Sequence, residues 1–413
     1  MPEATIDHIV SLIALLGAIL IFIGLFNQTI QTAVVYEEHA YLATECSDLL
    51  DSILLNPGSP SNTTLYWGTS NCTPTNFGLQ DPEFTQYELS PFSLMRLFYS
   101  PGSSVYYDKT NAYYSNNTLT LGESLLTPYN EVVNYTTVTQ LLGINGTLGF
   151  SLALTPLVSV ITTQTQSTNL SLTVTVTSNG YPLANAGLSY CLIAVSGQGS
   201  YPSFTIEPGT NTTNSQGQAL LSFPDVDGTK EPYALMVVCA SQSGLLGTGD
   251  YEHALNNESY AIPLIADFGN QSVLIANSQD VYLQNNPSSM SYNATFFLLT
   301  HGFTLSQMPL TNPAGNIDSG PGTSYGNITI PTNNPGILAI GYNVTNPDNT
   351  VSTGVTLMPW GISPMPLPVV LGGNPLQSDW VTEDIRQVTV NGISYQAKLE
   401  LWSLQGYTEI SQK

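Results

Sequence analysis

The first part of the chain carries its strongest hydrophobic pattern. Residues 9–26 read IVSLIALLGAILIFIGLF, a run with no charge and with only Ser and Gly as interruptions. As a helix rising about 1.5 Å per residue, this run nearly crosses a hydrocarbon core of ~30 Å. The preceding MPEATIDH is acidic and no small-x-small cleavage site follows directly, which fits a cleaved secretory signal poorly. We therefore predict a transmembrane helix.

A second pattern extends this helix beyond the apolar run, since residues 28–55 contain no Gly or Pro. Apolar residues recur there on one stripe at helical spacing: Val35, Leu42, Cys46, Leu49 and Ile53. Such a stripe is typical of an amphipathic helix. Asn56-Pro57-Gly58 then ends the helix. The pattern predicts one continuous membrane and stalk helix of roughly 75 Å.

The rest of the chain alternates apolar and polar residues in short runs. Residues 168–242 contain SLTVTVTSN, GYPLANAGLSYCLIAV, TNSQGQALLSF and YALMVVCAS, separated by Gly, Asn and Pro. This pattern is typical of an antiparallel sandwich. The same style continues from residue 260 to about 373, which predicts a second β domain, and a Pro/Gly-rich stretch at 360–375 links it to the last segment.

Several segments together resemble the archaeal membrane-anchored proteins of the type IV pilin-like family. The helix breaks at LLNPGSP and is followed by Trp67-Gly68. Residues 77–97 resemble the family's short second helix, introduced by a Ser-Pro N-terminus at Ser90-Pro91, and residues 134–154 resemble its Tyr-x5-Leu-Leu-Gly helix before a first strand. Residues 385–403 resemble its closing hairpin, turned at Asn391-Gly392. The family's precursors usually carry a basic leader, whereas MPEATIDH has no basic residue.

Inside this frame, Gly-x-Pro-x-x-Asn-Ala and Thr-x-x-x-Gly-x-Ala resemble bacterial-type immunoglobulin-like modules of surface adhesins. The expected fold class is α+β: a long N-terminal transmembrane/stalk helix, then a mainly antiparallel β body with one or two immunoglobulin-like sandwich domains. The expected segments are the membrane and stalk helix at 1–56, a pilin-like α/β region at 57–160, the immunoglobulin-like sandwich at 161–262, a second β domain at 263–375, and a C-terminal hairpin completing the pilin-like region at 376–413.

The charge composition excludes some classes of binding partner. Only 8% of residues are Asp, Glu, Lys or Arg, against about 25% in typical soluble domains. The net charge is −23, and the six basic residues are scattered singly: Arg96, Lys109, Lys230, Arg386, Lys398 and Lys413. Without a basic patch, binding to nucleic acid or to an anionic lipid surface is excluded. A surface with so few charges suits a glycosylated protein, an acidic medium, or close packing beside other copies of the chain.

Acceptor sequences for N-glycosylation are dense and favour an outside-facing glycoprotein. They lie at Asn62, Asn71, Asn116, Asn134, Asn145, Asn169, Asn211, Asn257, Asn270, Asn293, Asn327 and Asn343, with one more, Asn27, at the membrane edge.

The four cysteines have no C-x-x-C spacing, so neither a zinc site nor a thioredoxin-like motif is supported. Of three possible pairings, the local one joins Cys46 to Cys72 and Cys191 to Cys239, each within one predicted domain. We interpret them as structural disulfides outside the cytosol, with four buried free thiols as the alternative.

Patterns that carry chemistry are weak. Residues 322–326 match G-x-S-x-G, but a loop precedes the Ser, a strand follows it, and His253 and His301 lie in no recognisable partner segment. A Gly-rich turn is favoured over a nucleophile. Adjacent helical residues point in different directions, so Glu37-Glu38-His39 predicts a solvated face or a subunit contact rather than a metal site.

Two further patterns leave alternatives open. Asp225 and Asp227 could supply oxygen ligands to Ca²⁺, but the remaining ligands of a calcium loop are missing and an acidic turn is favoured. The tyrosines Tyr99, Tyr106, Tyr107, Tyr113 and Tyr114 suit a carbohydrate or protein contact surface, or a loop packed over the body.

The expected function is therefore mechanical. The chain is predicted to be a membrane-anchored extracellular pilin-like glycoprotein, acting in surface adhesion or as a minor filament subunit, with no enzyme site, cofactor or metal. It would contact the membrane through residues 9–26, associate with its own copies through the helix, and bind a surface carbohydrate or protein. The body would be extracellular on a single-pass anchor, or part of an extracellular filament. The alternative is a permanently tethered binding or envelope-layer protein.

Overall fold

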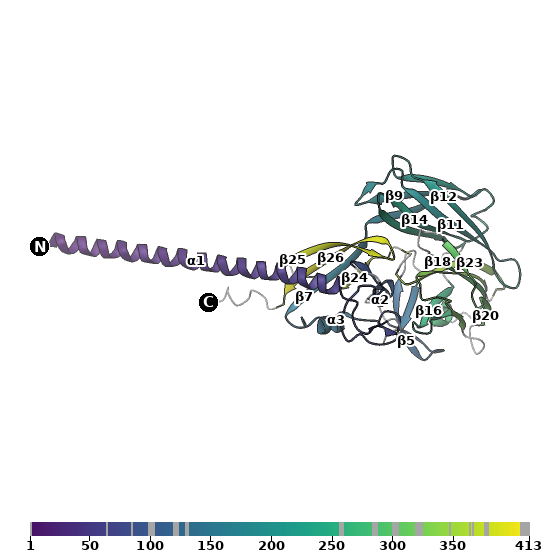
Figure 1. The fold of residues 1–413 in the computed structure, drawn as a ribbon, viewed down its shortest axis with the longest axis horizontal. Helices are drawn as coiled ribbons and strands as arrows, with labels where there is room; N and C mark the ends of the chain where they lie inside the picture. The colour runs from purple at the N-terminus through teal and green to yellow at the C-terminus, as the bar shows by residue number, and fades with distance from the viewer. Residues whose placement is uncertain are drawn as a thin grey trace.

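The structure is a computed structural model of the 413-residue chain. It describes residues 2–62, 65–83, 86–97, 104–118, 124–128, 132–255, 260–282, 288–299, 305–318, 325–346, 348–362, 365, 367–375 and 380–404. A long N-terminal helix is followed by a mostly antiparallel β body, which confirms the predicted class. The helix projects far out of the body (Figure 1).

Helix α1 runs without a break over Pro2–Leu54. It ends where the sequence predicts, at Asn56-Pro57-Gly58, and Gly58 adopts a left-handed φ of 76°. A returning segment satisfies carbonyls at this end of the helix, because Leu79 N donates to Ile53 O and Gln80 N to Asn56 O. A small hairpin of β1 (Ser61–Asn62) and β2 (Leu65–Tyr66) follows the helix.

The last third of α1 packs on a five-stranded sheet, here called the stalk sheet. Its order is β24-β7-β26-β25-β3, with β24 Val369–Gly372, β7 Leu148–Pro156, β26 Ile393–Ser403, β25 Val381–Val390 and β3 Glu88–Leu89. Asn391 and Gly392 have φ of 50° and 78°, so they join β25 and β26 in the tight turn that Asn-Gly predicts. Helices α2 (Pro91–Leu97) and α3 (Tyr135–Leu141) lie beside this sheet, and both match sequence expectations.

Two four-stranded sheets form a sandwich around a hydrophobic core of their own. The outer sheet contains β8 Val158–Gln166, β9 Ser171–Ser178, β10 Tyr181–Pro182 and β13 Gln218–Ser222. The middle sheet contains β11 Gly187–Ser196, β12 Ser203–Thr212, β14 Tyr233–Gln242 and β15 Leu245–His253. A sandwich is thus present where one was predicted, while its immunoglobulin-like type stays a prediction.

Two more sheets complete the body. The inner sheet contains β18 Ser289–Leu299, β19 Leu305–Met308, β20 Ala314–Asp318, β22 Gly336–Thr345 and β23 Val351–Trp360. The basal sheet contains β4 Val105–Tyr107, β5 Ala112–Thr118, β6 Ser124–Pro128, β16 Ala261–Asp267, β17 Ser272–Asn277 and β21 Tyr325–Thr329, with the short helix α4 (Ser278–Val281) beside it. Strands β4 to β6, from residues 105–128, therefore share one sheet with β16, β17 and β21, from residues 261–277 and 325–329. Strand β24 also pairs with β7, so the predicted segments 57–160 and 263–375 interleave.

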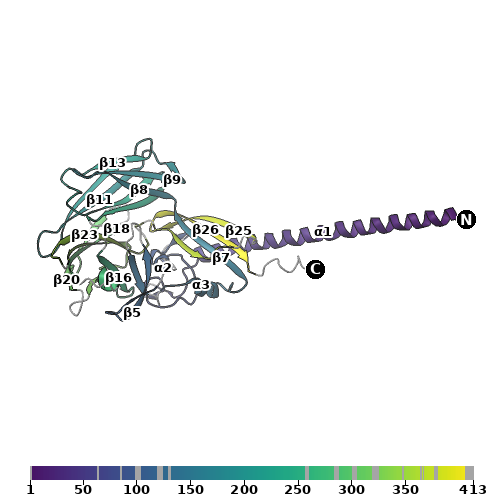
Figure 2. The same ribbon diagram turned by 180° about the vertical axis from the view of Figure 1, so that it is seen from behind.

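Strand β14, inside the middle sheet, is buried on both faces. Along β14, Leu235 and Val237 belong to the sandwich core, while Ala234 and Met236 belong to the main core shared by the rest of the body. Figure 2 shows the same stacking from behind, with β9 and β13 outermost, then β11, then β18 and β23, and β16 beyond them. Burial on both faces accounts for the continuous apolar run of β14, which an exposed sheet would not show.

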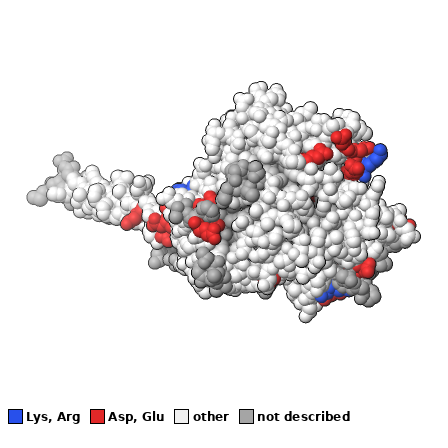
Figure 3. Space-filling model, turned by 45° about the vertical axis from the view of Figure 1, so that its right-hand side comes forward, with Lys and Arg blue, Asp and Glu red and all other residues white. Residues whose placement is uncertain are grey.

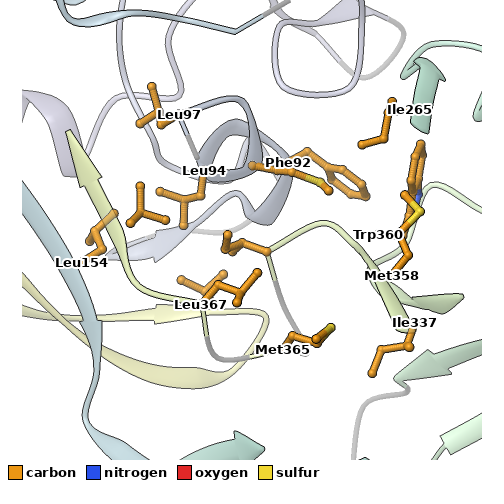
Figure 4. Packing of buried hydrophobic residues seen from close by; sticks show 14 of the residues in the cluster. Phe92, Leu94, Leu97, Leu154, Ile265, Ile337, Met358, Trp360, Met365 and Leu367 are labelled. Carbon is orange, nitrogen blue, oxygen red and sulfur yellow. The ribbon is translucent and has the colours of Figure 1, made fainter. Parts of the chain in front are cut away.

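Helix α2 fills the junction between the stalk sheet and the other layers. Figure 4 shows its Phe92 and Leu94 among side chains from β7, β16, β22 and β23. The ring of Phe92 meets Trp360 edge-on at 5.8 Å between centroids, and Phe268 approaches the same indole at 5.9 Å. The C-terminal part of α1, helix α2 and the stalk, inner, basal and middle sheets thus contribute to one continuous core.

Candidate functional site: the exposed apolar helix and its junction with the body

The N-terminal part of α1 is apolar and uncovered. Among the described residues, α1 is the one helix long and apolar enough to span a membrane. Its large side chains stand free, from Ile9 at 55% exposed through Phe22 at 69% to Val34 at 41%. A soluble environment would leave this surface in water, so the segment needs a lipid or protein partner.

The charge pattern of α1 matches the dimensions of a bilayer. Residues 8–36 contain no Asp, Glu, Lys or Arg. They span about 43 Å as a helix, close to the full thickness of a bilayer with its headgroups. Polar residues begin at Asn27, just after the apolar run, and Thr29 and Thr32 donate their hydroxyls to the carbonyls of Leu25 and Gln28 at 2.8 and 2.9 Å. These bonds satisfy the hydroxyls where water is scarce.

The stalk stripe becomes the docking face of the helix. Leu42, Cys46, Leu49 and Ile53 of the predicted stripe are buried against the stalk sheet, and Val35 is partly exposed. Cys46 lies beneath β25 and β26, with Sγ 3.6 Å from Leu399 O. Burial, assisted by the nearby Asp384, raises the pKa of this thiol to about 11. The amphipathic interpretation is therefore confirmed.

A polar clamp flanks this docked face. Arg386 of β25 pairs with Asp51 of α1 at 3.4 Å, donates to Ser47 Oγ at 3.0 Å, and pairs with Asp384 on its own strand. Tyr87 donates its hydroxyl to Asp51 at 3.3 Å. Sequence reasoning did not single out this clamp, because nothing local relates residue 386 to residue 51.

Because α1 has no break between the bare apolar segment and the docked stripe, the two are mechanically linked. The ring of His39 contacts Trp380 at 3.8 Å where the helix meets the body. Glu37 and Glu38 point into solvent there. The prediction of a solvated face therefore holds for Glu37 and Glu38, whereas His39 packs against the body. No group of three His, Cys, Asp or Glu in the described part of the chain is arranged to hold a metal ion.

The predicted disulfides are not formed, and all four thiols are free. Cys46 is enclosed under the stalk sheet, whereas Cys72 lies in a loop 2.7 Å from Ser70 Oγ. Cys191 and Cys239 lie on neighbouring strands but out of register, since Cys191 faces Met236 and Cys239 faces Ser189. A disulfide needs Cβ atoms directly opposite, so the local pairing is corrected in favour of free thiols.

The glycosylation sites divide by accessibility. Described sites with exposed side chains are Asn71, Asn134, Asn145, Asn169, Asn211, Asn270 and Asn327. Asn62 and Asn116 lie on strands whose side chains at these positions are not described, and Asn257 lies outside the described residues. Asn293 is partly buried and donates to Pro202 O at 2.9 Å.

Asn343 is buried, unlike the exposed acceptor asparagines. Its side chain is 7% exposed, donates to Gly197 O at 3.1 Å and accepts from Thr353 at 2.8 Å. The bond to Gly197 joins the inner sheet to the chain that follows β11 of the middle sheet, and the bond from Thr353 lies within the inner sheet. A glycan on this amide would prevent both. The Asn343 sequence is therefore a packing element of the folded protein.

Glycan mapping checks this division. In protein isolated from its native membrane, we expect glycosylation at exposed turns such as Asn145 and Asn169 and none at Asn343. The measurement is mass spectrometry of glycopeptides, with occupancy compared site by site. Substantial occupancy at Asn343 would contradict the packing described here.

Other candidate residues have structural partners. The Asp227 carboxylate accepts from Thr229 and pairs with Lys230 at 2.9 Å, which supports an acidic turn rather than a calcium loop, and Asp225 is exposed. In the G-x-S-x-G match, residues 322–324 lie outside the described residues. Strand β21 begins at Tyr325, so the strand expected after Ser324 is present.

Four of the five predicted tyrosines lie in the β4–β5 hairpin. Two of them pack against the body and two are exposed as a contact surface would be, so each of the two interpretations holds for one pair. Tyr107 and Tyr114 are buried in a small core under the basal sheet. Tyr106 and Tyr113 are 42% and 57% exposed, with ring centroids 4.9 Å apart. Tyr99 lies outside the described residues.

Charged side chains are sparse over the body. Figure 3 shows small isolated groups on an otherwise uncharged face, with acidic side chains beside the helix where it leaves the body. Lys230, Arg386 and Lys398 are paired with acids, and Arg96 is buried. The structure therefore gathers no basic surface from these residues.

Compared with protein-family models and with curated proteins, the chain shows no match.

Proposed function

We propose that this chain is a membrane-anchored surface protein of pilin-like design, with its β body outside the membrane. One observation carries the proposal: a single unbroken helix whose first part is apolar and bare and whose last third is locked into the body. Such a helix can hold the body at a lipid surface, or pack against copies of itself in the core of a filament. The role is mechanical rather than catalytic.

The position of the body outside the cell is supported by the exposed glycosylation sequences, which lie on strands β12 and β21 and in turns and loops spread over the body. The low charge also suits a surface that is glycosylated or bathed in acid. The positive-inside rule is silent, because no Lys or Arg flanks the apolar run.

A second candidate is a permanently tethered binding or envelope-layer protein. The breadth of the body favours it, because the sandwich lies well to one side of the helix axis (Figure 1) and would crowd a dense helical array of copies. The exposed Tyr106 and Tyr113 would then suit a carbohydrate or protein ligand.

Intact mass and N-terminal sequencing of the protein from its native membrane separate the two. A mature N-terminus just before Ile9 favours prepilin-type processing and filament assembly. An intact N-terminal segment favours the permanent tether. Electron microscopy of sheared surface material provides an independent readout, because filaments containing this chain would remove the second candidate.

Anchoring itself is tested by Leu16→Arg. Leu16 is 52% exposed near the middle of the apolar run, and Arg at the centre of a membrane helix costs about 2.5–3.5 kcal/mol. We expect a large fraction of the variant to leave the membrane pellet on alkaline extraction. Thr44→Arg, at an exposed position near the docked end of the same helix, is the control and should be retained. Equal retention of both variants would contradict a membrane span at residues 9–26.

A further inference from the structure

Strand β15 lies at the seam between the sandwich and the rest of the body. One of its faces belongs to the sandwich: a Cβ on Gly247 or Gly249 would meet Val158 or Val160 of β8, and Tyr251 packs against the sandwich core. Because side chains alternate along a strand, Leu246, Thr248, Asp250 and Glu252 occupy the opposite face. That face is turned toward the rest of the body.

Contacts on both sides of Asp250 confirm this orientation. At the start of β15, Leu246 N donates to Ser394 Oγ of β26 at 3.3 Å. At its end, the Glu252 carboxylate accepts from Leu357 N of β23 at 2.7 Å. Asp250 is opposite Met236 of β14, which belongs to the main core rather than the sandwich core. Along β15, Asp250 therefore lies between the two contacts that attach the sandwich to the stalk and inner sheets.

The surroundings of Asp250 disfavour a charge. Asp250 as a whole is partly exposed, and the burial of its carboxyl raises the pKa of Asp250 to about 6. The neighbouring Thr248 hydroxyl is buried and makes no hydrogen bond within the described residues. The cation on β26, Lys398, is held by Glu383 at 3.0 Å and Glu400 at 2.7 Å on the solvent side of the stalk sheet.

Few titratable groups lie on the elements around Asp250. Strands β8 and β23 carry none, β14 carries Tyr233 and Cys239, and β26 carries Tyr395, Lys398 and Glu400. On β15 itself Tyr251 and His253 face the sandwich core, and Glu252 shares the seam. Burial lowers the pKa of His253. Because its ring stacks on Tyr233 in the sandwich core, its protonation would act on that core and not on the seam.

We propose that Asp250 is a pH-sensitive latch between the sandwich and the rest of the body. As a neutral carboxyl it fits the seam, and the sandwich is held firmly. As a carboxylate it favours hydration, and the sandwich loosens from the inner and stalk sheets. The body would be most rigid in acid and would free its outermost domain as the pH rises toward neutrality. This inference stands apart from the membrane anchoring by α1.

The direction of the pH effect follows from the linkage between proton binding and stability. The native pKa of Asp250 lies above its unfolded value, so the native state binds more protons between the two values and is favoured by acid. The contribution is complete below about pH 4, falls as the pH rises, and is lost above about pH 6. His253 has the opposite sign, since its lowered pKa weakens the sandwich core in acid.

Hydrogen–deuterium exchange of the full-length protein in detergent micelles tests the latch. Rates corrected for intrinsic pH dependence are compared from pH 3.5 to 7.5 for peptides covering β15, β23 and, as an internal reference, β7. We expect protection of β15 and β23 to fall by up to about a hundredfold with rising pH, since two pKa units correspond to that factor. Protection of β7 should change little.

Asp250→Asn should remove the pH dependence at β15 and β23, because an amide cannot ionise. Asp225→Asn, which removes an exposed carboxyl of the same sandwich, should leave it unchanged. Glu252→Gln keeps the acceptor for Leu357 N and shows whether the second seam carboxyl contributes. Constant protection of wild-type β15 and β23 across the range, or an undiminished fall in a folded Asp250→Asn protein, would overturn the proposal. The wild-type comparison decides even if the variant does not fold.

Discussion

Replacing Arg96 with methionine is expected to lower the free energy of unfolding by about 3–5 kcal/mol, because buried carbonyls lose a charged donor. Arg96 is 1% exposed, and its guanidinium donates to Trp67 O, to Ser70 O at 3.2 Å and to Cys72 O at 2.9 Å. It also lies 5.5 Å from the centre of the Trp67 ring. Methionine fills similar space but leaves these oxygens without that partner. Urea unfolding in micelles, followed by tryptophan fluorescence, measures the change.

Arg386→Met is the matched control, since it removes the same group from a partly exposed ion-pair cluster with Asp51 and Asp384. Exposed pairs contribute about 1 kcal/mol or less, so this variant should remain close to wild type. A similar loss in both variants would show that the Arg96 network is not specially important. A near-neutral Arg96→Met would mean that the 67–72 loop finds other donors.

Local signals in the sequence predicted the elements well. The end of α1 at Asn56-Pro57-Gly58, the start of α2 after Ser90, and the Asn391-Gly392 turn were each fixed by residues adjacent to them. Asn134 likewise caps α3 by accepting from Thr137 N at 2.9 Å. Each feature depends on backbone geometry within a few residues, which a sequence displays directly.

Relations between distant segments could not be predicted in the same way. Nothing local shows that β6 lies beside β16, or that Arg386 reaches Asp51. One error, the predicted Cys46–Cys72 disulfide, and one buried acceptor site, Asn343, did have a signal in the sequence. Cys46 was placed on the apolar stripe that docks α1, and a docked thiol is not available to a loop cysteine. Asn343 interrupts the apolar run of β22, so its burial could have been suspected.

The latch at Asp250 had no such signal, because the strand LLGTGDYEH shows no clear alternation. The environment of Asp250 is formed by β14, β23 and β26, of which the last two are distant in the sequence. The low overall charge suits glycosylation, an acidic medium or close packing beside other copies, and it singles out no residue. The proposed latch names one residue and one direction with pH.

The second large effect is expected at Gly78, where α1 is fixed to the body. A Cβ on this residue would lie 2.0 Å from Asn56 O and 2.7 Å from Gly58 N, both backbone atoms. Gly78→Ala must therefore push residues 77–80 away from the helix end, where Leu79 N donates to Ile53 O at 2.8 Å. We expect a loss of about 3–4 kcal/mol from overpacking together with a broken carbonyl contact. Urea unfolding measures this loss, and hydrogen exchange in the last turn of α1 should rise.

Gly24→Ala provides the control on the same helix, because an added Cβ there meets nothing within 4 Å. Alanine favours the helix over glycine by up to about 1 kcal/mol, so this variant should be as stable as wild type or slightly more stable. The contrast separates a clash at the body from a general effect of altering helix-associated glycines. If Gly78→Ala left both stability and exchange unchanged, residues 77–80 could not be what locks the helix in place, and the mechanical link proposed between anchor and body would have to rest on the stalk sheet alone.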